Sequence, residues 1–185
     1  REIDAFTREL RAGETAESIK QQPAIAATRE AYKRCGKDPS RYRPSAEALR
    51  RRLMRGLELY QIDTLVDLVN LVSLRTGYSI GGFDADKIQG DSLELGIGRA
   101  EEPFEGIGRG TLNIEGLPVY RDRAGGIGTP TSDNERTKMG LETRRILAIV
   151  NGYNGREGLA EAAGMIQELL RKYADSDGGT IRYFE

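Results

Sequence analysis

The character of the sequence changes at Gly77, and this change limits the fold more than any other feature. Before Gly77, apolar residues recur at helical spacing, in segments bounded by proline or glycine. After Gly77, glycine becomes frequent and short β-type runs follow one another, separated by turn signals. Helices followed by strands, and then by one more helix, are typical of an α+β protein.

The amino-terminal part is expected to be helical. Pro23 and Pro44 stand where a first helical turn tolerates proline. Gly36, Gly56 and Gly77 follow the last apolar positions, as helix-terminating glycines do. The predicted helices cover residues 1–22, 23–35, 45–55 and 63–76.

The remaining part is expected to form a sheet and a closing helix. The run 146–150 is uniformly apolar, which predicts a central strand covered on both faces. Other strands are predicted at 93–99, 111–115 and 117–121, with a helix over 155–174 and an edge strand at 180–184. We therefore expect one α+β domain over residues 1–185, with N-terminal helices packed on a mixed central β-sheet and a long C-terminal helix.

The absence of histidine excludes a large part of enzyme chemistry. The 185 residues include no His and one Cys, so Ser–His or Cys–His nucleophiles, His-ligated zinc and internal disulfides are ruled out. Cys35 lies among basic residues, but without a His partner we do not expect it to be a nucleophile. No apolar run approaches the ~20 residues that span a bilayer. A cytoplasmic protein with no cofactor, no bound metal and no membrane or DNA partner is expected.

The net charge of −1 hides an uneven distribution. Residues 29–55 hold ten basic and three acidic residues, a charge of +7, so the rest of the chain carries −8. On the predicted helix 45–55, Ala48, Leu49 and Leu53 face inward, and the arginines lie off that stripe. Such a block is either a phosphate-binding face or an ordinary solvated pair of helices. The candidate RNA contacts are Arg41, Arg43, Arg50, Arg51, Arg52 and Arg55.

Two glycine-rich segments are the candidate pocket walls. In residues 81–87, paired glycines allow close approach to a ligand, while Asp84 and Asp86 either bind a metal or cap a short helix. In residues 124–133, consecutive amides can cradle a carboxylate or phosphate, or form an ordinary hairpin loop; no Walker pattern follows. The polar segment 133–138 either lines a pocket or caps a turn. Asp84 and Asp133 are the candidate catalytic residues.

The order of four motifs resembles a known family. The motifs are Asp67-Leu-Val-Asn70, Phe83-Asp84-Ala-Asp86-Lys87-Ile88, Gly98-Arg99-Ala100-x-Glu102 and Ala124-Gly125-Gly126-Ile127-Gly128. Together they resemble the B3/B4 domain of the bacterial phenylalanyl-tRNA synthetase beta subunit, over about residues 45–152. The flanking helices, with 1–44 as an N-terminal extension, are more similar to free-standing B3/B4 proteins, which carry this domain without a synthetase.

The resemblance implies an editing pocket that hydrolyses tyrosine wrongly attached to the phenylalanine tRNA. Asn70, Phe83, Asp84, Ala124 and Gly125 match the family pattern. The family's histidine and alanine fall at Gly81 and Gly82, its threonine at Val69, and its tyrosine-reading glutamate has no match in 146–150. Groups that would orient water and read a phenolic hydroxyl are therefore missing, and tyrosine editing is not expected.

Two functions remain open. One is an RNA-binding, specifically tRNA-binding, protein that acts in trans on an aminoacyl ester, with amides 124–126 holding the oxyanion. The other is a non-catalytic module for an amino-acid-like molecule, whose carboxylate Arg99 or Arg136 would hold. Either function uses the same predicted pocket, which is made of Asn70, Gly81, Gly82, Phe83, Arg99, Ala124, Gly125, Gly126, Ser132, Arg136 and Thr137.

Overall fold

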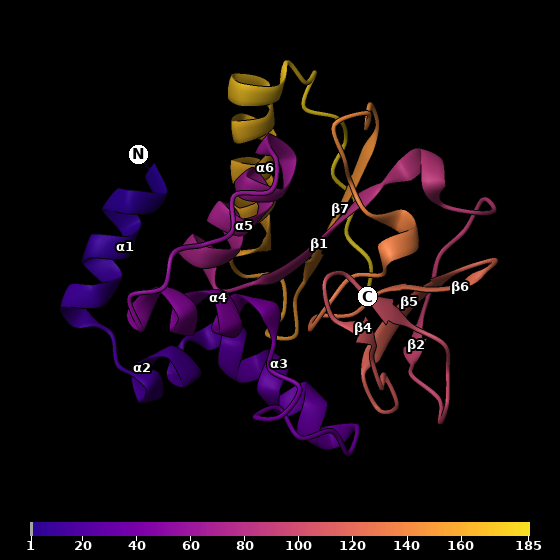
Figure 1. Cartoon of the computed structure of the whole chain (residues 1–185), viewed down its shortest axis with the longest axis horizontal. Coiled ribbons are helices and arrows are strands. Elements are labelled where there is room, and N and C mark those ends of the chain that lie inside the picture. Colours follow the sequence, from indigo (N-terminus) through magenta and orange to yellow (C-terminus); the bar gives the residue numbers. More distant parts are fainter. Residues whose placement is uncertain (1) are drawn as a thin grey trace.

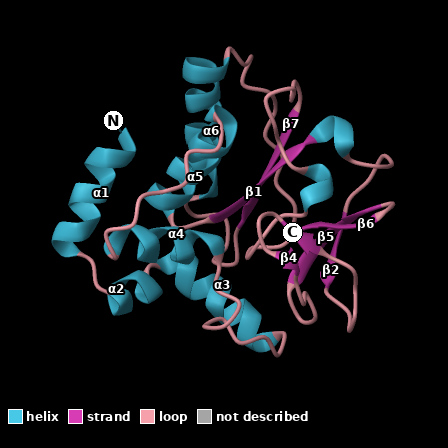
Figure 2. Cartoon of the chain, in the orientation of Figure 1, coloured by secondary structure: helices cyan, strands magenta, loops and turns pink. Residues whose placement is uncertain are grey.

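The computed structural model describes residues 2–185, with helices gathered on one side and strands on the other (Figure 1, Figure 2). The helices are α1 (Glu2–Gly13), α2 (Ala16–Gln21), α3 (Pro23–Arg34), α4 (Ser45–Met54), α5 (Thr64–Thr76) and α6 (Leu159–Ala174), with 3-10 turns η1 (Ala85–Lys87) and η2 (Glu135–Thr137). The strands are β1 (Ser79–Asp84), β2 (Glu94–Ile97), β3 (Glu105–Gly106), β4 (Gly110–Thr111), β5 (Pro118–Asp122), β6 (Gly125–Gly128) and β7 (Ile146–Asn151). The predicted α+β class and C-terminal helix are confirmed.

Local signals account for most helix ends. Asp63 caps α5 with its side chain, and Gly77 ends that helix in a left-handed conformation with φ of 78°. Pro23 is the first residue of α3. The predicted helix 1–22 is instead two helices, because the chain leaves α1 at Gly13 and a reciprocal capping box then starts α2.

The strands form three antiparallel sheets in place of one mixed sheet. β1 pairs with β7, β5 lies between β2 and β6, and β3 pairs with β4. For β5 and β6 the reason is the connection: β6 follows β5 after two residues, whereas a parallel pair needs a crossover of a dozen or more. The predicted strand 111–115 shrinks to the two-residue β4.

Strand β7 is not the central strand that its apolar run predicts. Within residues 2–185 it pairs with β1 alone. Ile146, Ala148 and Val150 pack against the core formed with α5 and α6, and all five residues of the run 146–150 are only partly buried. Burial on one face by two helices, rather than on both faces, therefore accounts for the run.

The predicted edge strand at 180–184 is also absent. These residues are exposed and form no strand, since the chain turns through Gly178 and Gly179 with positive φ before reaching them. Arg156 holds the segment instead, through an ion pair to Glu185 and a position 5.9 Å from the Tyr183 ring centroid.

The main core lies between the β1–β7 sheet and helices α5 and α6, around Val72, Ile80 and Ile166. Within residues 2–185, no helix has both the length and the apolar content needed to cross a membrane.

Buried polar contacts join the helical side to the glycine-rich loop after β6. The Tyr32 hydroxyl of α3 lies 2.8 Å from Thr131 Oγ1, which also donates to the Tyr42 carbonyl at 3.0 Å. The Ser45 amide donates to the Pro130 carbonyl at 2.8 Å. The loop is thereby tied to the start of α4, which lies within the basic segment 29–55.

Candidate functional site

The predicted pocket region is built around Asp122, at the end of β5. Its carboxylate accepts hydrogen bonds from the amides of Gln89, Ala124 and Gly125 at 2.8–3.2 Å. Arg136 closes the ring with two bonds, of 2.9 and 2.8 Å. Burial would raise the pKa of Asp122, but the bonds from Arg136 and the amides outweigh it and lower the pKa below its ordinary value.

This arrangement changes the role of the predicted pocket residues. The amides of Ala124 and Gly125, expected to hold an oxyanion, donate to the protein's own carboxylate. Gly126 is paired with Arg121 in the β5–β6 ladder. Arg136, expected to hold a ligand carboxylate, is occupied by Asp122. The groups expected to bind a ligand anion in the glycine-rich loop therefore bind the protein's own Asp122 carboxylate.

Phe83 fills the space beside the other glycine pair. A Cβ added to Gly81 would lie 2.7 Å from Phe83 Cζ, and one added to Gly128 would lie 2.5 Å from the same atom. A Cβ on Gly82 would meet Met139 Cε at 2.5 Å. These glycines allow close packing of Phe83 and Met139. The Phe83 ring occupies the space that the Cβ of the family's histidine would need at position 81.

Asp133 is the one predicted catalytic residue with unusual electrostatics. It is partly buried and its Oδ2 accepts a bond from the Gly82 amide at 3.2 Å. Burial raises its pKa to about 7, although the Gly82 bond acts in the opposite direction. Its Oδ1 lies 3.1 Å from where a Gly81 Cβ would be. A group titrating near neutral pH thus stands close to the position of the family's histidine.

Asp84, the other catalytic candidate, is buried in a structural role. Its Oδ1 accepts from the Asp86 amide at 3.0 Å, which caps η1. Its Oδ2 accepts from the Thr143 hydroxyl at 2.9 Å and lies 3.7 Å from Lys87 Nζ. Nowhere in the described part of the chain do three or more acidic or thiol side chains gather to hold a metal ion.

The remaining predicted pocket residues do not converge on one point. Asn70 is partly buried on α5, Arg99 is exposed beyond β2, and the Ser132 amide donates to Thr129 Oγ1 at 3.0 Å. Thr137 is buried, with a hydroxyl that has no hydrogen-bond partner. A cavity of about 550 Å³ along α6 and one of about 190 Å³ beside η1 are both lined by other residues.

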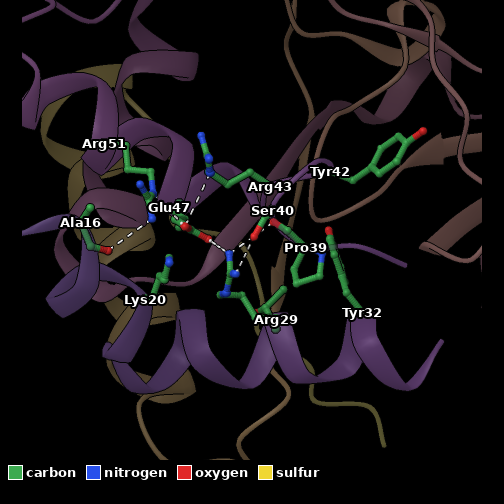
Figure 3. A network of polar contacts seen from close by, with 12 residues as sticks. Ala16, Lys20, Arg29, Tyr32, Pro39, Ser40, Tyr42, Arg43, Glu47 and Arg51 are labelled. Atoms are coloured by element: carbon green, nitrogen blue, oxygen red, sulfur yellow. Dashed lines mark hydrogen bonds and ion pairs between the residues drawn. The ribbon is translucent and has the colours of Figure 1, made fainter. Parts of the chain in front are cut away.

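The basic segment has a different organisation, centred on one buried carboxylate. Glu47 of α4 is 0% exposed. Arg29 Nη1 donates to its Oε2 at 2.9 Å, and Arg51 Nε donates to its Oε1 at 2.8 Å (Figure 3). Arg43 Nε reaches only to 3.6 Å from Oε1 and makes no hydrogen bond, although it is buried. Three guanidiniums therefore share a single counter-charge.

Arg43, Glu47, Arg51 and Arg55 follow one another at four-residue intervals, which places them along one line of α4 and its ends. We call the three arginines of this line the arginine stripe. Burial lowers the pKa of Arg43 below its ordinary value, and the charges of Arg51, Arg55 and Arg29 lower it further, against the attraction of Glu47. With Arg29, the stripe carries three positive charges more than Glu47 neutralises.

Two of the candidate RNA contacts serve the fold. Arg50 is 4% exposed and donates to the carbonyls of Leu74 and Arg75 at the end of α5, and to Glu14. Arg51 is also buried, and its Nη2 donates to the Ala16 carbonyl at 3.3 Å. The helical pattern predicted neither burial, because carbonyls from outside α4, those of Leu74, Arg75 and Ala16, take part in it.

The other candidates reach the surface. Arg41 and Arg55 are exposed, while Arg43 and Arg52 are partly so. Arg52 Nε donates to the Glu58 carbonyl at 2.6 Å, and its guanidinium lies 4.1 Å from the centroid of Tyr60. Tyr60 is not among the sequence-predicted site residues. The sequence signal that could have identified Tyr60 is its position eight residues after Arg52, on the other side of a turn.

The chain matches the family model described as the B3/4 domain over residues 27–171, which is well over half its length. It belongs to the B3/4 domain family. The match begins within α3, so the B3/4 region includes Arg29, Glu47 and the arginine stripe. No curated protein matches the sequence.

Proposed function

We propose that this B3/4 protein binds RNA through Arg43 and Arg55, the residues of the arginine stripe that reach the surface, and that tRNA is the RNA class, as the family resemblance implies. The observation that carries the proposal is the excess of arginine over carboxylate around Glu47. Exposed arginines with ordinary counter-ions would be an unremarkable surface, but three charges in excess at one place favour an external anion.

The stripe suits phosphate in particular. A guanidinium offers donors in a planar fork that matches phosphate oxygens, and it stays charged near neutral pH. Burial and the neighbouring positive charges both lower the pKa of Arg43, and an anion bound beside it would relieve the repulsion among these charges. Phosphates along an RNA backbone supply such anions in series.

The amino-acid-binding alternative has less support from the geometry. It relies on Arg99 or Arg136 to hold a carboxylate, and Arg136 already holds Asp122 through two bonds. Arg99 is exposed, and its amide donates to Glu102. We therefore favour the RNA-binding function.

The test is a comparison of tRNA affinity across salt concentrations. Replacing Arg43 and Arg55 by glutamine (R43Q/R55Q) removes two phosphate contacts, so the affinity should fall about tenfold and the slope against log salt should flatten by about 2. The matched control is R123Q/R182Q, which removes two exposed arginines far along the chain from the stripe. Equal losses in both variants, or none in either, would contradict the assignment.

One observation favours a second candidate function, hydrolysis of an aminoacyl ester. Asp133 has a pKa of about 7 and lies near the position of the family's histidine. As a carboxylate it would accept a proton from water while the water oxygen attacks the ester carbonyl, and it would return that proton to the ribose oxygen as the ester C–O bond breaks. Deacylation of a misacylated tRNA panel should then rise with pH through about 7 and disappear in Asp133→Asn. No turnover on any member of the panel would remove this function and leave RNA binding in place.

A further inference from the structure

The loop between α4 and α5 exposes an unusual group of apolar side chains. Tyr60 is 71% exposed, Ile62 is 62% exposed and Leu57 is 48% exposed, all within six residues of one another. The loop leaves α4 directly after Arg55, so it continues from the arginine stripe.

Tyr60 is held against a guanidinium. Arg52 lies 4.1 Å from the ring centroid, a distance typical of a cation–π contact. The Nε bond from Arg52 to the Glu58 carbonyl anchors this guanidinium to the loop. One side of the ring is therefore supported by a fixed cation, while most of its surface stays accessible.

Three guanidiniums lie where the loop leaves α4, and they outnumber the loop's own carboxylates, Glu58 and Asp63. Besides Arg52 and Arg55, Arg11 of α1 reaches it: its Nε donates to the Leu53 carbonyl at 3.0 Å, and its Nη2 would lie 3.9 Å from a Cβ on Gly56. A supported aromatic ring in a positively charged setting is the combination with which proteins bind single-stranded nucleic acid, stacking bases and holding phosphates.

We propose that Tyr60 is a stacking platform for an unpaired nucleobase of the bound RNA, with Arg52 and Arg55 beside the adjoining phosphates. The inference rests on the proposed RNA binding and adds to it the class of RNA: a strand with unpaired bases rather than an uninterrupted duplex. Bases within a duplex are already stacked on each other and cannot reach the ring.

A second copy of this chain is a weaker occupant. In a two-fold symmetric contact the same patch meets itself, so Arg11, Arg52 and Arg55 would face their own copies. Like charges brought together across an interface oppose binding. A polyanion, in contrast, is attracted by all three.

The experiment measures affinity for two RNAs of equal length and charge, one unstructured and one fully paired, at fixed salt. Tyr60→Ala should weaken binding of the unstructured RNA about tenfold and change binding of the paired RNA less than about twofold. Tyr60→Phe should restore binding, and Tyr60→Leu should not, because leucine keeps apolar area without an aromatic face. Tyr183→Ala is the matched control, since Tyr183 is also exposed beside an arginine.

Four results would overturn the platform. An equal loss of affinity for both RNAs would exclude stacking and leave the proposed RNA binding intact. Wild-type affinity of Tyr60→Leu for the unstructured RNA would do the same. A wild-type dimer that Tyr60→Ala converts to a monomer, measured by light scattering, would assign the loop to self-association. Absence of any salt-dependent RNA binding by the wild-type protein would instead overturn the proposed function together with the platform.

Discussion

The arginine–carboxylate centres at Asp122 and Glu47 differ in their charge balance. At Asp122 one carboxylate meets one arginine and three backbone amides, and every bond is short. At Glu47 one carboxylate meets three arginines, and the third makes no hydrogen bond. The first centre satisfies its own charges, whereas the second retains positive charge that an external anion can neutralise.

The difference shows why a glycine-rich loop is a poor guide to a binding site by itself. The consecutive glycines after β5 suggest backbone amides that are available to bind an anion. In the structure, the amides of this loop donate to Asp122 instead. In sequence, the basic helix resembles an ordinary solvent-exposed surface. In the structure, three arginines pair with its single buried carboxylate, Glu47. What separates a structural site from a ligand site here is the count of unneutralised charges, not the motif.

The largest effect is expected at Glu47. Glu47→Gln leaves Arg29 and Arg51 buried without their counter-charge, so the free energy of unfolding should fall by about 3–5 kcal/mol. Urea denaturation measures this loss. Glu30→Gln is the control, because Glu30 is an exposed partner of Lys33 and Arg34 and its loss should cost less than about 1 kcal/mol. Similar losses in the two variants would show that Glu47 does not hold the helices together.

A smaller loss is expected at Asp122. Asp122→Asn removes the charge from bonds to Arg136 and the loop amides, which should lower the free energy of unfolding by about 2 kcal/mol. Affinity for tRNA should stay unchanged, since this centre is structural. If Asp122→Asn reduced tRNA affinity while Arg43→Gln did not, the assignment of the two centres would be reversed.

Asp133 should make stability depend on pH. Its folded-state pKa of about 7 exceeds the ordinary value of 3.8, so the folded protein binds more protons between these values and loses stability as pH rises through them. Partial exposure limits this loss to about 1–2 kcal/mol. Denaturation at pH 4 to 8 should show the decline in the wild type and a flatter profile in Asp133→Asn. Parallel profiles would contradict the raised pKa.

The smallest effect on stability is expected in the stripe. With Arg43 and Arg55 both replaced by glutamine, Glu47 keeps Arg29 and Arg51, so the free energy of unfolding should change by less than about 1 kcal/mol. Urea denaturation without RNA measures it. A loss as large as that of Glu47→Gln would make Arg43 a structural residue and weaken the contrast between the centres.

Features with local causes could be predicted from the sequence. Asp63 and Gly77 mark the ends of α5, and the capping role of Asp84 follows from its place before η1. Each depends on backbone groups within a few residues, where spacing alone determines which atoms meet. The α+β class followed for the same reason, since helical and extended periodicities are properties of short segments.

Features that depend on tertiary contacts could not be predicted. Asp122 and Arg136 are fourteen residues apart, and no local pattern pairs them. Arg50 lies off the apolar stripe of its helix, yet carbonyls at the end of α5 bury it. Phe83 matches the family motif, but its filling of the space beside Gly81 and Gly128 depends on two strands meeting. The four-residue spacing from Arg43 to Arg55 could be read from the sequence. The burial of Glu47, which makes it the shared counter-charge of several arginines, could not.

Arginine footprinting tests the central claim most directly. The wild-type protein is treated with phenylglyoxal, which modifies accessible guanidiniums, with and without tRNA, and the modified sites are located by mass spectrometry. We predict that tRNA protects Arg43, Arg52 and Arg55, leaves exposed Arg123 and Arg182 unchanged, and does not alter Arg136, which Asp122 holds in either state. Protection at Arg136 or Arg123, with none at Arg43 and Arg55, would contradict the account.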